Sequence, residues 1–179
     1  MKKILIYSVI AILLYSCGPS LQFFSDYDKN INLSGYVSYS WLDLAAIEGK
    51  GMNPLYYNEL NDKRIKEAVD KQMKTRNFQP FSTKGELELH YHIIVEDKTT
   101  VITEPIGSQY RPNPNNYRTS TYQYREGTLI IDLMDTKNNT LIWRGWATDV
   151  ITNAVRKNPE AAINNAVAKI FGAFPAAKH

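Results

Sequence analysis

The feature that most constrains the fold is a strict alternation of side chains along residues 86–93. The odd positions are apolar or aromatic, and the even positions carry glutamate or histidine. Because successive side chains of a β-strand point to opposite faces, this pattern predicts a strand with one buried and one polar face. The sheet that contains it therefore has a polar side, and helices are expected on the other side alone.

Three further segments carry strand patterns. Residues 37–41 alternate large and small side chains, so Val37 is expected to point inward with the tyrosine and tryptophan that follow it. Residues 127–135 and 141–146 are rich in apolar residues, and residues 136–139 between them predict a hairpin turn. These last two strands are therefore expected to be antiparallel.

Two helices are predicted. The first begins at Asn58 or Asn61 and runs to Arg76, with apolar side chains spaced to form one stripe. The second begins at Asn158, which precedes a proline and a glutamate, and ends before Pro175. The predicted fold is α+β: a single mixed β-sheet of four to five strands in the order β-α-β-β-β-α, with both helices packed on one face.

Residues 101–126 lie between two predicted strands and are rich in tyrosine, proline and asparagine. This composition predicts a long loop, and long loops are often functional. The alternation at 122–124 indicates that the second half of the segment extends the next strand as a ribbon. The loop belongs to the one predicted domain, residues 31–175. Its candidate interaction residues are Tyr110, Tyr117, Tyr122 and Tyr124.

The N-terminus has the order of a secretory signal. Two lysines precede an apolar run that is too short for the ~20 residues with which a helix spans a bilayer. Residues 14–17, Leu-Tyr-Ser-Cys, resemble the lipobox of bacterial lipoproteins, in which a signal peptidase cuts before the cysteine and the new terminus is acylated. We therefore expect residues 1–16 to be a lipoprotein signal peptide. Residues 17–30 are then a tether and N-terminal extended segment, with the lipid on Cys17.

Acylation makes the membrane the first expected partner, because two or more acyl chains hold a protein stably at a bilayer. Cys17 is followed by Gly18 rather than by aspartate or an acidic run, which favours the periplasmic face of the outer membrane. The alternative is an ordinary secretory signal with an incidental thiol. Cys17 is the only cysteine, so no intramolecular disulfide forms.

Several segments resemble a known family. They are residues 127–133, which begin Gly-Thr-Leu, residues 141–147, which contain Trp-Arg-Gly, and the short runs 39–41 and 174–175. Together they are similar to the bacterial lipoprotein family known as domain of unknown function 4136. The resemblance implies the α+β fold and an envelope location. Because the family has no assigned activity, it implies no catalytic residues.

His90 and His92 lie on the polar face of their strand together with Glu86 and Glu88. Two histidines at this spacing share a metal when a third ligand approaches. The simpler interpretation is an exposed face on which these side chains pair with neighbours such as Arg144. The sequence therefore predicts no metal site.

Asp132 is expected beside the histidines across the sheet, where a general base would lie. No phosphate-binding glycine loop, nucleophile elbow or metalloprotease helix motif accompanies it in the sequence. The sequence therefore predicts neither a catalytic residue nor a cofactor.

Trp143 and Trp146 fall on opposite faces of the strand at 141–146. Trp143 is expected in the core, whereas Trp146, Ile142 and Met134 are expected to point outward as an apolar patch. An exposed patch of this kind marks a binding or oligomer surface, so Trp146 is a candidate interaction residue. The alternative is that the N-terminal strand or the 101–126 loop covers the patch.

These observations predict a membrane-anchored bacterial lipoprotein that acts as a non-enzymatic binding or assembly factor of the cell envelope. Its partner would be an envelope protein, or a glycan or lipid ligand. Nucleic acid is not expected, because the net charge is only +3 and no basic run remains once the signal is removed. The first alternative is a carrier or sensor of an envelope glycan or lipid, with the four tyrosines stacking on sugar rings or acyl groups. The second is an unrecognised hydrolase.

Overall fold

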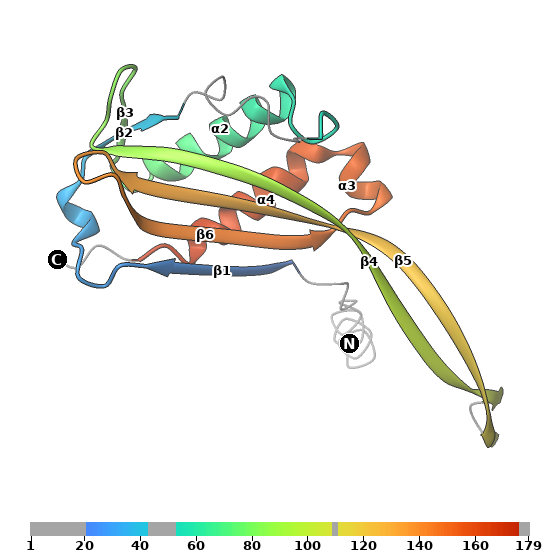
Figure 1. The fold of residues 1–179 in the computed structure, drawn as a ribbon. Helices are drawn as coiled ribbons and strands as arrows, with labels where there is room; N and C mark the ends of the chain where they lie inside the picture. The colour runs from blue at the N-terminus through green and yellow to red at the C-terminus, as the bar shows by residue number, and fades with distance from the viewer. Residues whose placement is uncertain (1–20, 43–52, 109–110, 176–179) are drawn as a thin grey trace, which may run out of the picture.

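One six-stranded mixed sheet organises the fold (Figure 1). The computed structural model describes residues 21–42, 53–108 and 111–175, with the side chains of residues 106–116 outside this description. In sheet order the strands are β1 (Gln22–Tyr27), β6 (Thr140–Val150), β5 (Arg111–Asp135), β4 (Leu87–Ser108), β2 (Ser38–Trp41) and β3 (Gln79–Pro80). The helices are the 3-10 turn η1 (Leu33–Gly35), α2 (Glu59–Lys74), α3 (Asn153–Lys157) and α4 (Pro159–Gly172).

The predicted α+β class and single mixed sheet are confirmed, but the number of elements is higher than expected. The described part of the chain contains six strands rather than four to five, and three α-helices rather than two. The additional elements are short: β1 has 6 residues, β3 has 2 and α3 has 5. Segments of this length contain too few repeats of a side-chain pattern to be recognised in the sequence.

The strand pairing has the predicted directions. β2 runs parallel to β4, with Tyr39 opposite Leu87, and α2 connects the two strands. β4 is antiparallel to β5, and β5 is antiparallel to β6. In the turn between β5 and β6, Asn139 has φ 53°, a left-handed conformation that asparagine tolerates.

The two long helices, α2 and α4, begin where asparagine side chains cap them. Asn58, the earlier of the two predicted starts, accepts a hydrogen bond from the N–H of Asn61 at 3.0 Å. Asn158 accepts one from the N–H of Ala161 at 3.1 Å, and a proline occupies the first position of α4. α2 ends at Lys74, two residues before the predicted position, and Asn77 beyond it has φ 65°, a left-handed conformation that asparagine tolerates after a helix.

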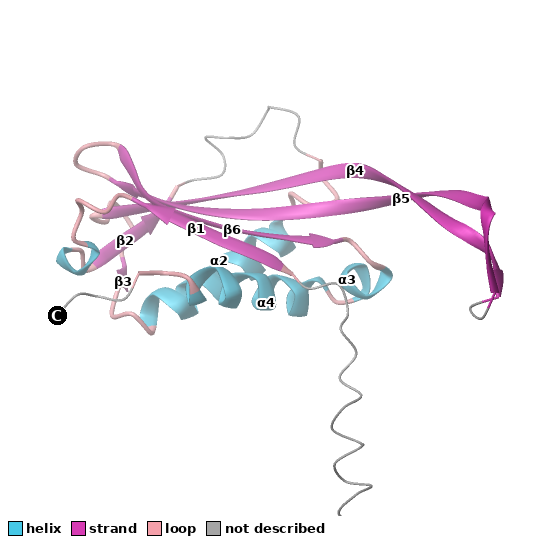
Figure 2. Ribbon diagram, turned by 90° about the horizontal axis from the view of Figure 1, so that it is seen from below, coloured by secondary structure: helices cyan, strands magenta, loops and turns pink. Residues whose placement is uncertain are grey.

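The core lies between one face of the sheet and the two long helices, and no helix of the described chain covers the other face (Figure 2). The ring of Trp143 is fully buried and packs on Phe171 and Phe174, with centroid distances of 5.4 and 5.1 Å. Leu87, Leu89 and Tyr91 of β4 are buried in the core, as the alternation predicted. The largest fully buried side chains include Tyr39, Ile65, Met73, Leu133 and Ile170.

The segment predicted as a long loop is a two-stranded arm. β4 and β5 continue as an antiparallel ribbon that extends beyond the rest of the domain (Figures 1 and 2). We call the ribbon the arm and the rest of the domain the body. The arm comprises residues 96–108 and 111–126, and none of its described side chains belongs to the buried core. The loop prediction for 101–126 was wrong because a ribbon with solvent on both faces needs no apolar and polar alternation. The expectation that the second half of the segment extends the next strand as a ribbon is confirmed, because β5 begins at Arg111 and pairs with β4.

The sheet also begins earlier than residue 31, the predicted domain boundary. β1 lies in the predicted tether and pairs with β6, from Gln22 opposite Thr148 to Tyr27 opposite Trp143. Most of its side chains are exposed, so its sequence carries no buried-face pattern that would have placed it in the domain.

Two side-chain directions differ from the prediction. Val37 precedes β2 and is exposed, so the inward face of that segment begins at Tyr39. Ile142 is buried in the core instead of pointing outward. The pairing of β5 and β6 shifts register between Leu133 and Met134, and this bulge turns both Ile142 and Trp143 toward the core.

Candidate functional site

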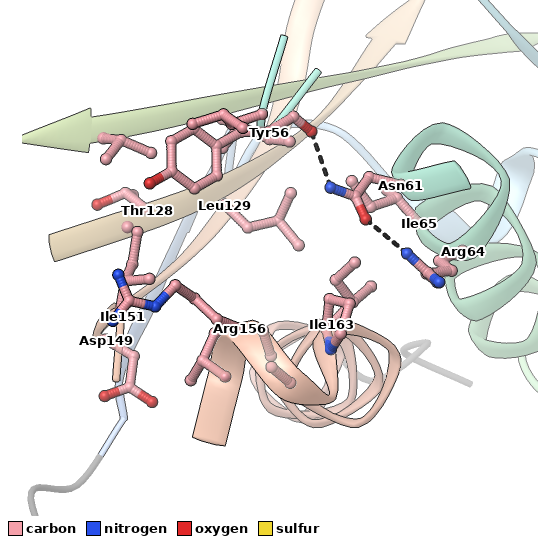
Figure 3. Close-up of a pocket in the computed structure, with 18 of the residues that line it drawn as sticks. Tyr56, Asn61, Arg64, Ile65, Thr128, Leu129, Asp149, Ile151, Arg156 and Ile163 are labelled. Atoms are coloured by element: carbon pink, nitrogen blue, oxygen red, sulfur yellow. Dashed lines mark hydrogen bonds between the residues drawn. The ribbon is translucent and has the colours of Figure 1, made fainter. Parts of the chain in front are cut away.

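A pocket of about 800 Å³ lies between the sheet and the N-terminal ends of α2 and α4 (Figure 3). It is at the base of the arm, because Gly127 and Asp149, which are opposite each other in β5 and β6, both line it. Small-molecule sites typically occupy roughly 300–1,000 Å³ and have mostly apolar walls. The pocket is therefore the candidate functional site.

The floor of the pocket is the inner face of the sheet. Ile93, Leu129 and Ala147 stand opposite one another across β4, β5 and β6 and form one apolar row. α2 contributes Ile65 to the wall, and α4 contributes Ile163. The alternation that directs the odd positions of β4 inward thus builds part of the core and also the floor of this pocket.

Small residues leave the pocket unfilled. Gly127 and Ala147 occupy the floor, and Ala162 and Ala166 face it from α4. Protein interiors are normally packed as densely as organic crystals, so large side chains at these positions would close the space. The volume is therefore a consequence of where glycine and alanine stand in the sequence.

A chain of hydrogen bonds holds one guanidinium at the pocket wall (Figure 3). The side-chain amide of Asn61 donates to the backbone carbonyl of Tyr56 at 3.0 Å, and its oxygen accepts a hydrogen bond from Arg64 Nη1 at 2.9 Å. Both Asn61 and Arg64 are partly buried. The amide therefore fixes the orientation of the guanidinium at the edge of an apolar surface.

The other arginines of the pocket differ in their partners. Arg125 Nε donates to Asp97 Oδ1 at 2.8 Å, and this hydrogen bond raises the pKa of Arg125 above its ordinary value. Arg156 donates to the side chain of Asn153 and lies across the pocket from Arg64 (Figure 3). The acidic residues lining the pocket are Glu59, in the first turn of α2, and Asp149.

The predicted polar face of β4 carries a second cluster, on the sheet face that has no helix. Arg144 donates two hydrogen bonds of 2.6 Å to Asp132, whose side chain is only 4% exposed. His92 Nε2 lies 3.7 Å from Asp132 Oδ2, whereas His90 Nε2 lies 2.8 Å from Glu88 Oε2. The histidines thus have different carboxylate neighbours, and the described residues contain no group of three or more His, Cys, Asp or Glu arranged to hold a metal.

The candidate tyrosines lie on the arm, away from the pocket. Tyr122 and Tyr124 share one face of the ribbon, opposite Thr100 and Lys98 of β4. Tyr117 is an odd number of residues away and so lies on the other face. Tyr110 and Cys17 lie outside the described residues. The described tyrosines therefore form no single platform.

Trp146 lies on the helix-free face, as predicted. Phe24 of β1 stands opposite it and stacks on its ring, with a centroid distance of 5.7 Å. Phe24 is itself exposed, so the N-terminal strand covers Trp146 only in part. No helix in the described part of the chain is both long and apolar enough to cross a bilayer.

The family model described as "Domain of unknown function (DUF4136)" matches residues 23–176 of this chain. The chain belongs to the DUF4136 family. The family resemblance seen in the sequence is thereby confirmed. No curated protein matches the chain.

Two solved structures share the fold of this DUF4136 chain. A PDZ domain protein from Parabacteroides distasonis superposes with a TM-score of 0.56 at 9% identity, over 97% of this chain and 40% of that one. This chain therefore spans less than half the length of that neighbour. A DUF4136 family protein from Bacteroides thetaiotaomicron superposes with a TM-score of 0.53 at 16% identity, over 87% of this chain and 96% of that one. At such low identities the likeness concerns the fold.

The segments that carry the DUF4136 resemblance have structural roles. Trp143 fills the core, Arg144 pairs with Asp132 on the opposite face, and Gly145 leaves room for the indole ring. Gly127 is the exception, because it lines the pocket. The resemblance therefore identifies the fold and gives little information on ligands.

Sequence reasoning missed the pocket. Its lining residues come from α2, α3, α4, the three central strands and Leu21, so no single segment contains a motif. The one local signal was Asn61, an asparagine inside the first turn of a helix whose cap is already supplied by Asn58. A polar residue at that position is free to orient a neighbour, here Arg64.

Proposed function

We propose that this chain is a membrane-anchored, non-enzymatic ligand-binding protein of the bacterial cell envelope, whose pocket holds an apolar small molecule such as a lipid chain. The observation that carries the proposal is the mostly apolar pocket of about 800 Å³ between the sheet and the helices. Transfer of apolar surface from water into such a site gains roughly 25 cal/mol per Å². Of the functions considered from the sequence, the lipid carrier or sensor is therefore best supported.

The position of the pocket along the chain supports a lipid as the ligand. Leu21 lines the pocket and stands four residues after Cys17. Four residues span at most about 14 Å when fully extended. An acylated Cys17 would thus keep the pocket close to the bilayer surface, on the periplasmic face of the outer membrane under this proposal.

The helix-free face gives less support to a hydrolase. Asp132 is the acid best placed to act as a base beside His92, but Arg144 already donates to both of its carboxylate oxygens. These two hydrogen bonds occupy both carboxylate oxygens and hold the side chain in place.

The proposal is tested by what remains bound to the intact protein. The acylated chain is purified from bacterial membranes in mild detergent, and the retained small molecules are extracted and identified by mass spectrometry. Ala162→Trp places an indole ring among the pocket-lining side chains and narrows the pocket, whereas Ala161→Trp places the same side chain on an exposed position one residue away. We expect a lipid to be retained by the wild type and by Ala161→Trp but not by Ala162→Trp. Equal retention by the two variants would contradict the proposal.

A second candidate function is assembly with another protein through the arm. An isolated two-stranded ribbon is only marginally stable in water, and both of its outer edges carry unpaired backbone groups. Val101, Tyr117 and Tyr122 are exposed on it. A partner that pairs with an edge of the arm would satisfy these groups.

A further inference from the structure

We infer that the ligand of the pocket is an anionic amphiphile, an acyl chain with a carboxylate or phosphate head group, and that Arg64 binds the head group. This inference rests on the proposed function, because it presumes that the pocket holds an apolar chain. It adds the chemical class of the ligand and the residue that selects it.

The Arg64 guanidinium has no ionic partner among the described residues. Its one hydrogen bond to another described side chain goes to the neutral amide of Asn61. No described carboxylate lies within ion-pair distance of it, in contrast to Arg125 and Arg144. Arg156 is likewise bonded to a neutral amide, but it is exposed, whereas Arg64 is partly buried. Arginine presents five N–H donors, so several remain for a ligand.

The charges along α2 also leave Arg64 without an acidic partner. The neighbouring lysines already have acidic partners: Lys63 pairs with Glu67, and Lys66 pairs with Asp62 at 3.0 Å. The acidic side chains near Arg64 on the same helix are therefore already paired with lysines. Glu59, an acid of the first helical turn, also lines the pocket, but the positive end of the helix dipole partly offsets its charge.

The position of Arg64 also suits an amphiphile. Asn61 holds Arg64 at the edge of the apolar wall, with Ile65 next to it in the same wall (Figure 3). A fixed guanidinium loses little side-chain entropy when it binds, and it matches the planar geometry of a carboxylate or the oxygens of a phosphate. A head group at Arg64 directs the attached chain over the floor formed by Ile93, Leu129 and Ala147. One anionic amphiphile would therefore match both the charge of the guanidinium and the apolar floor of the pocket.

The test compares an acid with its uncharged ester. cis-Parinaric acid, a naturally fluorescent long-chain fatty acid, and its methyl ester are titrated into the purified full chain, and fluorescence gives the Kd. The variants are Arg64→Gln, the conservative Arg64→Lys, and Lys63→Gln, which removes the same charge from an exposed neighbour. Ala162→Trp serves as the variant with a narrowed pocket, and thermal unfolding confirms that each variant is folded.

We expect the acid to bind the wild type, and Arg64→Gln to weaken it about tenfold or more, as loss of a charged hydrogen bond would. Arg64→Lys should restore part of the affinity, Lys63→Gln should leave it unchanged, and the ester should bind wild type and Arg64→Gln alike. If acid and ester bind equally in every variant except Ala162→Trp, the head-group inference fails while the pocket function stands. If neither probe shows binding that Ala162→Trp removes, both proposals fail.

Discussion

The indole ring of Trp143 lies against Gly145, two residues further along β6. A Cβ atom at Gly145 would come within 2.5 Å of Trp143 Cη2 and within 2.5 Å of Ile170 Cγ2. Non-bonded carbon atoms do not approach so closely, so any side chain at this position would displace the indole ring or α4. The Trp-Arg-Gly run is thus a packing unit in which the glycine makes room for the tryptophan.

We predict that Gly145→Ala lowers the free energy of unfolding by about 1–3 kcal/mol, as overpacking of a core does. Denaturant unfolding followed by circular dichroism measures the change. The control is Gly172→Ala, at the end of α4, where an added Cβ meets nothing within 4 Å. Alanine favours the helix there by up to about 1 kcal/mol, so the control should be unchanged or more stable. Equal stability of the two variants would argue against the packing role of Gly145.

The Asp132–Arg144 pair provides a second stability test. Arg144→Ala leaves a buried carboxylate without its partner. Because Arg144 is itself 44% exposed, solvent screens part of the interaction, and we expect the free energy of unfolding to fall by about 2 kcal/mol. The comparison is Arg125→Ala, which breaks the similar but well exposed pair with Asp97 and should change stability little. Denaturant unfolding measures the loss of unfolding free energy in both variants. A larger loss in Arg125→Ala than in Arg144→Ala would contradict this expectation.

A tyrosine and an aspartate link β5 to the segment before β2. Tyr36 Oη donates to Asp135 Oδ2 at 2.7 Å, and this hydrogen bond, with those from the N–H groups of Asn138 and Lys137, lowers the pKa of Asp135 below its ordinary value. A lowered acid pKa stabilises the fold above the unfolded pKa of about 3.9, and this contribution is lost as the pH falls through the folded value. Tyr36→Phe should therefore begin acid unfolding at a higher pH than the wild type. Coincident acid transitions would show that the hydrogen bond does not tune Asp135.

The same hydrogen bond also makes stability depend on alkaline pH, through ionisation of the tyrosine. Burial, with the hydrogen bond to Asp135, raises the pKa of Tyr36 to about 12. A raised pKa gives a contribution that is complete below the unfolded value of about 10 and is lost as the pH rises toward the folded one. The Tyr36→Phe variant lacks this group and should lose less stability between these pH values. Urea unfolding at pH 9, 10 and 11 compares the two proteins.

The body should fold without the arm. Replacing residues 99–123 by Asn-Gly, which favours a two-residue hairpin turn, removes most of the arm and none of the buried core side chains. We expect a cooperative thermal transition close to that of the intact chain. Crosslinking in cells then tests the assembly role, because any partner bound through the arm should be lost. A shortened chain that does not fold would show that the arm is part of the domain.

The sequence predicted the elements that have one buried face. Alternation identified the inner face of β4, and the asparagine caps at Asn58 and Asn158 identified both long helices, because side-chain periodicity records which face is buried. The arm and β1 were missed for the converse reason. Most of their described side chains are exposed, so their sequences show no buried-face periodicity. The prolines and asparagines of the arm are residues typical of loops, and they led to the loop prediction.

The pocket was not predictable by the same reasoning. Its floor follows the buried pattern of a core, and its volume depends on Gly127, Ala147 and Ala162 being small at positions that are distant in sequence. Pattern analysis records whether a position is apolar, whereas a cavity depends on the summed side-chain volume at positions that only the fold brings together. Tyr117, Tyr122 and Tyr124 were conspicuous in the sequence, but alternation distributes these three side chains over two faces of the arm.

The most direct test of the account is to map where a lipid contacts the protein. A fatty acid carrying a photoreactive diazirine is supplied to cells that make the full chain, and peptides modified on irradiation are identified by mass spectrometry. The account predicts modification within residues 55–65 and 150–166, which line the pocket, and its loss in Ala162→Trp but not in Ala161→Trp. Modification confined to the arm, or to Phe24 and Trp146 on the helix-free face, would contradict it.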